Sequence, residues 1–371
     1  MKKIKVAIVF GTRPEAIKMC PLVLELKKRP EFDVVTIVTA QHRQMLDQVL
    51  NLFEIKPDID LNIMKPNQNL WGLTSEILTK TGEIFEQNKY DIVLVHGDTT
   101  TAFATALSAY YAHIPIGHVE AGLRTYNINN PFPEEVNRVF ADVLSNLYFA
   151  PTDLSIKNLT RVPEVDKKNI YKTGNTVIDA LFWTISNTKT TLDFLNLNEH
   201  KKTILVTAHR RENFGKPLKS ICSAILKLAT ARDDIEFVYP VHMNPNVRKT
   251  VEEMLSNNPN IRLVEPLEYE QFSLLMKKAT LILTDSGGVQ EEAPSLGVPV
   301  LVLRNETERP EAIEANCVQL VGSDENKIVS TVNKLLDNED EYYKMAHAAS
   351  PYGDGTASAK IAEAILNHFS H

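Results

Sequence analysis

The sequence predicts an α/β protein built from two Rossmann-like, doubly wound domains that face a central cleft. Short apolar segments of strand length alternate with amphipathic helices along nearly the whole chain, which is the pattern of a parallel sheet with helices on both faces. The alternation breaks at Gly174-Asn175 and restarts after a polar region at residues 187–202. A length of 371 residues fits about two domains.

In the first half, strands are expected where a short apolar run stands between turn residues, and helices where apolar residues recur with helical spacing. The expected strands are 4–10, 34–38, 92–96, 114–119, 147–150 and 170–173. The expected helices are 14–28, 44–53, 73–87, 100–112, 134–144 and 153–159. We therefore expect residues 1–173 to form an N-terminal domain.

The second half repeats the pattern, beginning with a helix near Thr176. The expected strands are 204–207, 237–240, 261–264, 281–284, 300–303 and 318–320. The expected helices are 217–231, 245–256, 269–278, 289–296, 325–337 and 339–349. Residues 174–355 then form a C-terminal domain, and a last helix begins at residue 356. Facing sheets of this kind would present the carboxyl ends of their strands, where such sheets bind ligands, to one cleft.

The composition excludes several classes of function. A net charge of −7 does not indicate a nucleic-acid groove, so an anionic ligand must be held by local basic residues. The cysteines (Cys20, Cys222 and Cys317) are too far apart in sequence for a metal cluster or a disulfide framework. The N-terminal apolar run is too short for a signal peptide, and no run is long enough to span a membrane. We expect a cytoplasmic protein with no metal or cofactor.

The Ser286-Gly287-Gly288 segment, between an expected strand and an expected helix, is the centre of the predicted site. Glycines allow close approach of a ligand and positive φ, and the free amides of the first helical turn attract phosphate. Glu292 lies further along this helix, where a carboxylate can bind ribose hydroxyls. The alternative is that the two glycines only form a tight turn.

Charged residues also follow the expected strands of the first half. Arg13 and Lys18 flank the start of the first helix, where both can meet phosphate oxygens. Asp98 either serves the site or caps the next helix. Glu120 has no evident capping role. Glu134 starts a helix, where it suits the dipole and makes an ordinary i,i+4 pair with Arg138, or it serves catalysis. Three carboxylates from successive loops can supply separate acid and base groups.

The second half adds His209 and Arg210 after a strand, either as an anion and proton-transfer site or as a charged surface loop. Phe272 can stack on a base, although an aromatic residue in a helix more often belongs to the core. Arg309 can pair with Glu292 or reach the ligand.

Eight segments, in sequence order, carry a resemblance to a known family: GTRPEAIKM, HGDTTT, HVEAGLRT, PFPEEVNR, TGNTVIDAL, TAHRREN, TDSGGVQEEAPSLGVP and ERPEA. Together they resemble the non-hydrolysing UDP-N-acetylglucosamine 2-epimerases, from Gly11 to the segment 352–355. The resemblance implies a glycosyltransferase-B arrangement whose last helix, 356–371, packs back on the first domain. It also implies a cytoplasmic homodimer that supplies UDP-N-acetylmannosamine for surface polysaccharides.

The reaction implied by the resemblance is elimination of UDP to a 2-acetamidoglucal, followed by re-addition. The C2 proton is not next to a carbonyl, and the dinucleotide fingerprint GxGxxG is absent. By motif match, the catalytic residues are Asp98, Glu120, Glu134, Arg138 and His209. The substrate-binding residues are Arg13, Lys18, Leu267, Phe272, Ser286, Gly287, Gly288, Glu292 and Arg309. Phe272 and the Leu267 backbone would hold uracil, Glu292 the ribose and Arg309 the nucleotide, with Gly174-Asn175 near a hinge.

Members of the family often bind a second UDP-N-acetylglucosamine as an activator. Gln41, Gln44, Arg210 and His242 match positions tied to that site, whereas Asn67 stands where some members have an arginine. The alternatives are a glycosyltransferase of the same fold, a hydrolysing epimerase that releases free N-acetylmannosamine, and a nucleotide-sugar sensor. The intact carboxylate set disfavours the transferase and the sensor.

Overall fold

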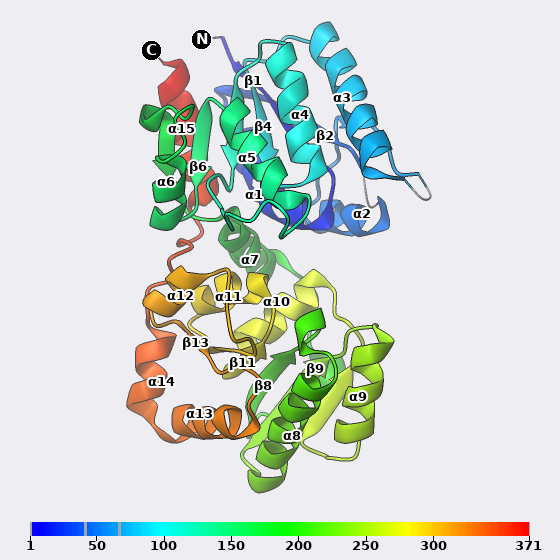
Figure 1. Cartoon of the computed structure of the whole chain (residues 1–371), viewed down its shortest axis with the longest axis vertical. Coiled ribbons are helices and arrows are strands. Elements are labelled where there is room, and N and C mark those ends of the chain that lie inside the picture. The colour runs from blue at the N-terminus through cyan, green and yellow to red at the C-terminus, as the bar shows by residue number, and fades with distance from the viewer. Residues whose placement is uncertain (1, 41–42, 66–67, 371) are drawn as a thin grey trace. The chain divides into compact units, whose positions relative to one another are not determined.

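The computed structural model describes residues 2–40, 43–65 and 68–370. The chain forms two compact units (Figure 1). Unit 1 comprises residues 1–183 and 352–371, and unit 2 comprises residues 184–351.

Unit 1 contains a seven-stranded parallel sheet with the order β3-β2-β1-β4-β5-β6-β7. Its strands are β1 (Ile4–Phe10), β2 (Phe32–Val38), β3 (Ile59–Asp60), β4 (Ile92–His96), β5 (Ile116–Val119), β6 (Leu147–Ala150) and β7 (Ile170–Lys172). Its helices are α1 (Arg13–Lys28), α2 (Arg43–Leu52), α3 (Leu70–Gln87), α4 (Thr100–Tyr111), α5 (Glu134–Leu144), α6 (Asp153–Leu159) and α15 (Ala357–Phe369), and α7 (Thr176–Asn187) begins in it. The strand order reverses between β1 and β4, which is where ligands bind in doubly wound sheets.

Successive side chains of β1 belong alternately to two separate buried clusters. Val6, Ile8 and Phe10 join a buried cluster with residues of α1, α2 and α15. Ala7 and Val9 join another cluster with residues of α3 and α4 on the opposite face. Because successive strand side chains point to opposite faces, helices cover both faces of the sheet.

Two helix starts next to the sheet edge are fixed by capping. Thr12 and Glu15 form a capping box at the start of α1. The Thr99 hydroxyl accepts a hydrogen bond from the Ala102 amide and so caps α4. Asp98 is therefore not the N-cap residue of α4, and the expectation that it caps this helix is wrong.

Unit 2 contains a six-stranded parallel sheet with the order β10-β9-β8-β11-β12-β13. Its strands are β8 (Lys202–Thr207), β9 (Ile235–Pro240), β10 (Ile261–Val264), β11 (Leu281–Thr284), β12 (Val300–Val302) and β13 (Val318–Leu320). Its helices are α8 (Lys216–Ala231), α9 (Pro245–Leu255), α10 (Tyr269–Lys278), α11 (Gly287–Glu292), α12 (Pro310–Glu314), α13 (Glu325–Asp337) and α14 (Glu339–Ala346). The order reverses between β8 and β11.

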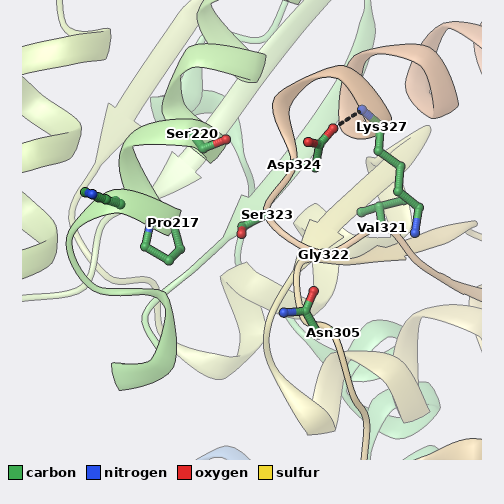
Figure 2. Close-up of a pocket in the computed structure, with 9 residues that line it drawn as sticks. Pro217, Ser220, Asn305, Val321, Gly322, Ser323, Asp324 and Lys327 are labelled. Carbon is green, nitrogen blue, oxygen red and sulfur yellow. Dashed lines mark hydrogen bonds between the residues drawn. The ribbon is translucent and has the colours of Figure 1, made fainter.

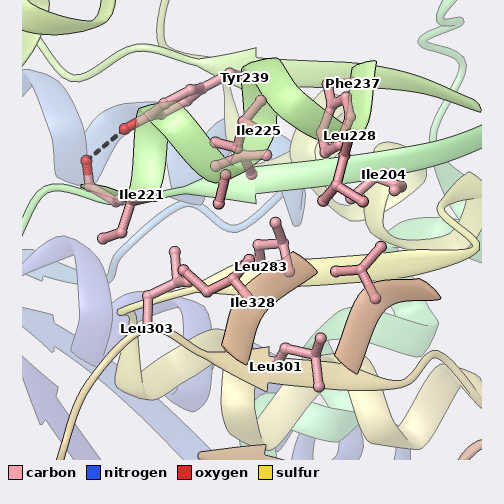
Figure 3. Close-up of a cluster of buried hydrophobic side chains, with 14 of the residues drawn as sticks. Ile204, Ile221, Ile225, Leu228, Phe237, Tyr239, Leu283, Leu301, Leu303 and Ile328 are labelled. Atoms are coloured by element: carbon pink, nitrogen blue, oxygen red, sulfur yellow. Dashed lines mark hydrogen bonds between the residues drawn. The ribbon is translucent and has the colours of Figure 1, made fainter. Parts of the chain in front are cut away.

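The core of unit 2 packs α8 and α13 against the sheet. Figure 3 shows Ile221, Ile225 and Leu228 of α8 near Phe237 and Tyr239 of β9. The Tyr239 hydroxyl donates a 2.8 Å hydrogen bond to the carbonyl of Ala208, the first residue after β8 (Figure 3). The core thereby anchors the start of a loop that carries candidate site residues.

The predicted α/β class, with two doubly wound parallel sheets, is confirmed, with small differences in the elements. The two-residue strand β3 and the short helix α12 were not predicted. The helix expected at residues 289–296 starts earlier, at Gly287, and continues after Glu292 as a 3₁₀ helix, Ala293–Leu296.

The division between the units falls within α7, after Trp183, which is later than the boundary expected at residue 173. The early part of α7 packs into unit 1: Ala180 belongs to its core, and the Asp179 carboxylate accepts from the amides of Ala357 and Ser358 at the start of α15. Helix α15 in turn packs on α1 (Figure 1). Among the described residues, no helix has both the length and the apolar character needed to cross a bilayer.

Candidate active site

Glu120, directly after β5, is the most constrained candidate residue of unit 1. Its φ is +64°, a left-handed conformation that residues other than glycine rarely adopt. Its carboxylate pairs with the ammonium of Lys18 and accepts a 2.8 Å hydrogen bond from Nδ2 of Asn175. Nε2 of His96 lies 3.8 Å away. An unfavourable backbone conformation held by several partners is a common feature of functional sites.

Asp98 follows β4 and Glu120 follows the neighbouring strand β5, so both lie at the same edge of the sheet. A Cβ added to Gly97, the residue before Asp98, would lie 3.6 Å from Oε1 of Glu120. The Asp98 carboxylate accepts a hydrogen bond from the Arg138 guanidinium, and its backbone carbonyl accepts from Nδ2 of Asn137 at 3.0 Å. The end of β4 is thus tied to α5.

Arg138 makes a different pair from the one expected. Its second terminal nitrogen donates to Glu135 at 3.1 Å, so its partners are Asp98 and Glu135 instead of Glu134. Glu135 is buried and also accepts from the amides of Thr125 and Tyr126. Glu134 is half-buried at the first position of α5.

The loop after β1 is organised by Glu15, a residue that sequence reasoning did not single out. Its buried carboxylate accepts from the amides of Gly11 and Thr12 at 3.1 and 2.8 Å and from the Thr99 hydroxyl at 2.6 Å. Burial raises the pKa of this carboxyl, although the hydrogen bonds oppose the rise. Arg13, half-buried, then begins α1.

In unit 2, the buried Asp285 holds the loop that carries His209. Its Oδ2 accepts from the amides of His209 and Arg210, both at 2.8 Å, and from Nδ2 of Asn213 at 2.9 Å. Its Oδ1 lies 3.5 Å from Nδ1 of His209. Burial lowers the pKa of His209, opposed by Asp285 and reinforced by His242 and Arg210. Neither Asp285 nor Asn213 was singled out from the sequence.

The Ser286-Gly287-Gly288 segment forms the start of α11. Ser286 is the N-cap residue, and its side chain makes no capping hydrogen bond. Gly287 and Gly288 are not among the positive-φ glycines, so that part of the expectation is wrong, while room for close approach remains. A Cβ at Gly287 would lie 3.7 Å from Nη2 of Arg210, and one at Gly288 would lie 3.6 Å from Oε2 of Glu292. The segment is therefore flanked by a guanidinium and a carboxylate.

Neighbouring side chains brace this helix start. The Tyr269 hydroxyl donates to Glu292 at 2.8 Å, and Gln290 links the Ser286 carbonyl to the Thr307 hydroxyl. Arg309 pairs with Glu291. The other two candidates of this unit, Leu267 and Phe272, are half-buried, before and within α10.

Among the tentative activator residues, Arg210 and His242 both lie near His209. The rings of His242 and His209 stack with 5.3 Å between their centroids. Gln44 is exposed on α2 of unit 1, and Gln41 and Asn67 lie outside the described residues.

Unit 2 also contains a separate pocket of about 540 Å³ (Figure 2). It is lined by Lys216, Pro217, Ser220, Asn305, Val321, Gly322, Ser323, Asp324 and Lys327, and none of the predicted site residues contributes to it. Across residues 2–40, 43–65 and 68–370, no group of three or more histidine, cysteine, aspartate or glutamate side chains is arranged to hold a metal ion.

The fold and these two clusters define a doubly wound α/β protein with carboxylates and cations gathered at the switch point of each sheet. A family model described as UDP-N-acetylglucosamine 2-epimerase matches residues 24–366. The chain belongs to this family, which confirms the resemblance carried by its motifs, and it is an enzyme of the isomerase class.

Individual relatives are similar to this chain over 97% or more of their length. The chain is 53% identical to the UDP-N-acetylglucosamine 2-epimerase of Campylobacter jejuni over 98% of this chain and 97% of that one. A crystal structure described as a putative UDP-N-acetylglucosamine 2-epimerase from Listeria monocytogenes is 48% identical, with a TM-score of 0.94 over 99% and 97% of the two chains. The enzyme from Neisseria meningitidis, bound to UDP-GlcNAc, is 51% identical, with a TM-score of 0.87 over 98% and 100%.

Proposed function

We propose that this protein interconverts UDP-N-acetylglucosamine and UDP-N-acetylmannosamine by inverting the configuration at C2, without hydrolysis. Membership of the family supports the substrate, as does the similarity to the Neisseria enzyme bound to UDP-GlcNAc. The observation that carries the proposal is Glu120, a carboxylate presented from a left-handed backbone conformation beside Lys18 and Asn175.

The proposed chemistry is elimination followed by re-addition. A carboxylate removes the C2 proton, the C1–C2 double bond of a 2-acetamidoglucal forms, and the C1–O bond breaks with its electron pair leaving on UDP. UDP then adds back to C1, and a proton is delivered to C2 from the other face. Two faces require at least two acid–base groups, which Asp98, Glu120 and Glu134 supply.

The cations of the candidate site suit the departure of UDP, which is the other half of the elimination. Negative charge develops on the diphosphate as UDP leaves, and positioned donors that face this charge lower the barrier. We assign this role to Arg13, Lys18, His209 and the amides at Gly287 and Gly288. Arg138 holds the Asp98 carboxylate. The uracil is held by Phe272 and by the backbone of Leu267. Glu292 holds the ribose, and Arg309 binds the nucleotide.

Two further expectations are proposals of the same kind. A second UDP-N-acetylglucosamine would act as an activator through Gln41, Gln44, Arg210 and His242. Hyperbolic initial rates, with no acceleration of the reverse reaction by added UDP-N-acetylglucosamine, would rule this out. The enzyme would act in the cytoplasm, and its product would supply the synthesis of surface polysaccharides.

We also propose a homodimer formed through the apolar surface of α4 and α5. These helices pack on each other and leave Tyr110, Tyr111, Phe140 and Val143 exposed. Adjacent exposed aromatic side chains are typical of protein interfaces. Light scattering on the purified protein should give twice the mass of one chain, and Tyr111→Lys with Phe140→Lys should halve it. A wild-type monomer would contradict the dimer without affecting the chemistry.

The reaction is tested by proton NMR of the purified protein with UDP-N-acetylglucosamine in D₂O. We expect UDP-N-acetylmannosamine that carries deuterium at C2, with no free sugar. Asp98→Asn and Glu120→Gln should each abolish turnover and keep UDP affinity, whereas Asp153→Asn, which alters an exposed carboxylate paired with Lys172, should leave both unchanged.

The other outcomes separate the rival functions. Free N-acetylmannosamine with UDP would indicate a hydrolysing enzyme. No reaction without an added acceptor would indicate a transferase or a sensor. Unchanged rates in both carboxylate variants would remove these residues from the mechanism.

A further inference from the structure

We propose that His118 is a positioning residue for the candidate carboxylates: as a buried imidazolium, it ties the Gly97-Asp98 turn to Asp142 of α5. This inference rests on the proposed function for its effect on the rate. The charge state that we assign to His118 stands on the structure alone.

His118 lies in β5, between β4 and β6, and its side chain is fully buried. Nε2 donates a 2.8 Å hydrogen bond to the carbonyl of Gly97. Nδ1 lies 2.5 Å from Oδ1 of Asp142, which is also fully buried. One ring therefore joins the end of β4 to a helix.

The partners of the ring determine its protonation. A backbone carbonyl only accepts hydrogen bonds, so Nε2 carries a proton. Nη2 of Arg124 donates to the other oxygen of Asp142 at 2.5 Å, which favours the ionised carboxylate. An ionised carboxylate also only accepts, so Nδ1 carries a proton as well. His118, Asp142 and Arg124 then form a buried cation–anion–cation group.

Two titratable groups on the neighbouring strands, His96 and Tyr148, carry no charge that offsets the charge of this triad. Burial by itself raises the pKa of Asp142, but His118 and Arg124 hold that pKa below its usual range. On β4, burial lowers the pKa of His96 to about 3, so this ring is neutral. On β6, the Tyr148 hydroxyl donates to the Ser145 carbonyl, and its pKa is raised by burial.

The elements that the triad joins are those that carry the candidate carboxylates. Asp98 directly follows Gly97, whose φ is +63°. Glu120 follows β5 by one residue, and Glu134 opens the same helix that carries Asp142. Fixing the ends of β4 and β5 to α5 therefore fixes the spacing of all three groups. An error of about 1 Å in such spacing can lower a rate about 100-fold.

The charge state is tested on the wild-type protein without substrate. Nitrogen NMR of ¹⁵N-histidine-labelled protein should show one imidazole with both nitrogens protonated, as the two acceptors around the ring require. His118→Gln should remove that signal and so assign it. A ring that carries a proton on only one nitrogen would overturn the imidazolium assignment.

The positioning role is tested by steady-state kinetics. His118→Ala should lower kcat about 100-fold and change KM and UDP affinity little. His118→Gln, whose amide can still donate to the Gly97 carbonyl, should recover part of that loss. Phe85→Leu is the control for destabilisation of the core, because Phe85 packs on Tyr90, before the other end of β4.

These experiments distinguish failure of the positioning role from failure of the proposed function. If kcat of His118→Ala falls no more than kcat of Phe85→Leu, or if the glutamine variant recovers nothing, positioning by His118 is wrong. If the wild-type protein does not epimerise its substrate, the proposed function fails, while the nitrogen spectrum still reports on the triad.

Discussion

The imidazole rings of His209 and His242 stack almost in parallel, with 5.3 Å between centroids and 11° between planes. His209 is the candidate proton-transfer group of unit 2, and His242 is a residue of the proposed activator site. The stack gives the two roles a direct physical contact, because a ligand that moves His242 also changes the surroundings of His209.

We predict that His242→Gln alters both the titration and the activity of His209. The exposed ring of His242 contributes to the lowered pKa of His209, so its removal should raise that pKa toward the ordinary value of about 6.5. An aromatic contact of about 1 kcal/mol is also lost, and we expect kcat to fall up to about tenfold.

NMR titration of the His209 ring measures the first effect, and initial rates measure the second. His200→Gln is the matched control, since His200 is an exposed loop residue of the same unit. An unchanged His209 titration in the His242 variant would show that the stack does not influence the ring.

The sequence predicted the fold well because each strand carries its own local signal. The bounds of β1, β4, β6, β10, β11 and β13 were predicted to the residue. Strand β3 has only two residues, Ile59 and Asp60, and so offers no run long enough to recognise. Helix α12 has five residues and little apolar periodicity.

The candidate site was predictable only in part. Its charged residues follow strands, so their positions in the sequence indicated a sheet edge. Their partners could not be found in this way, because Asn175 meets Glu120 and Asp285 meets His209 only after distant segments have folded together. For the same reason, the sequence alone did not show that Arg138 pairs with Asp98 instead of Glu134.

The next prediction concerns the proposed phosphate seat. A Cβ at Gly288 would make only ordinary contacts, at 3.6 Å from Glu292 and 4.0 Å from Ser286, so Gly288→Ala should leave the thermal midpoint of unfolding unchanged or slightly raised. The exposed methyl group should nevertheless obstruct a diphosphate at the amides, and we expect UDP affinity to fall at least about tenfold.

Isothermal titration of UDP measures this loss. Gly82→Ala is the matched control, because it introduces the same methyl group in helix α3 with an ordinary 3.6 Å contact to Ser108. Equal UDP affinity in both variants would move the diphosphate away from the start of α11.

A prediction about pH follows from His96, which is buried beside Glu120. Nε2 of His96 has no hydrogen-bond partner among the described residues, and burial lowers the pKa of the ring to about 3. Its pKa in the unfolded chain is about 6.5. Between these values the unfolded chain binds a proton that the folded chain does not bind. The free energy of unfolding should therefore fall as the pH falls below about 6.5, by up to about 1.4 kcal/mol per pH unit from this group.

Urea unfolding of the wild-type protein and His96→Gln at several pH values isolates this contribution. From about pH 6.5 to about pH 5, the wild-type protein should lose up to about 2 kcal/mol more than the variant. A stability difference between the two proteins that does not change with pH would mean that His96 titrates normally in the folded state.

The last prediction separates two tasks of Asp285. Asp285→Asn keeps an oxygen for the amides of His209 and Arg210, so we expect a loss of only about 1 to 2 kcal/mol in the free energy of unfolding. The new amide group, however, would face Nδ1 of His209 in place of an oxygen 3.5 Å away. It would donate to Nδ1 and move the ring proton to Nε2, which can then no longer act as a base. We therefore expect kcat to fall at least about 100-fold.

The control is Asp324→Asn, which makes the same change at the N-cap of α13, where asparagine caps as well as aspartate. Nitrogen NMR should show the proton of His209 on Nδ1 in the wild-type protein and on Nε2 in Asp285→Asn. If kcat falls while the tautomer stays the same, Asp285 acts only by holding the loop. If kcat is unchanged although the tautomer moves, His209 transfers no proton through Nε2, and its role is confined to binding the diphosphate.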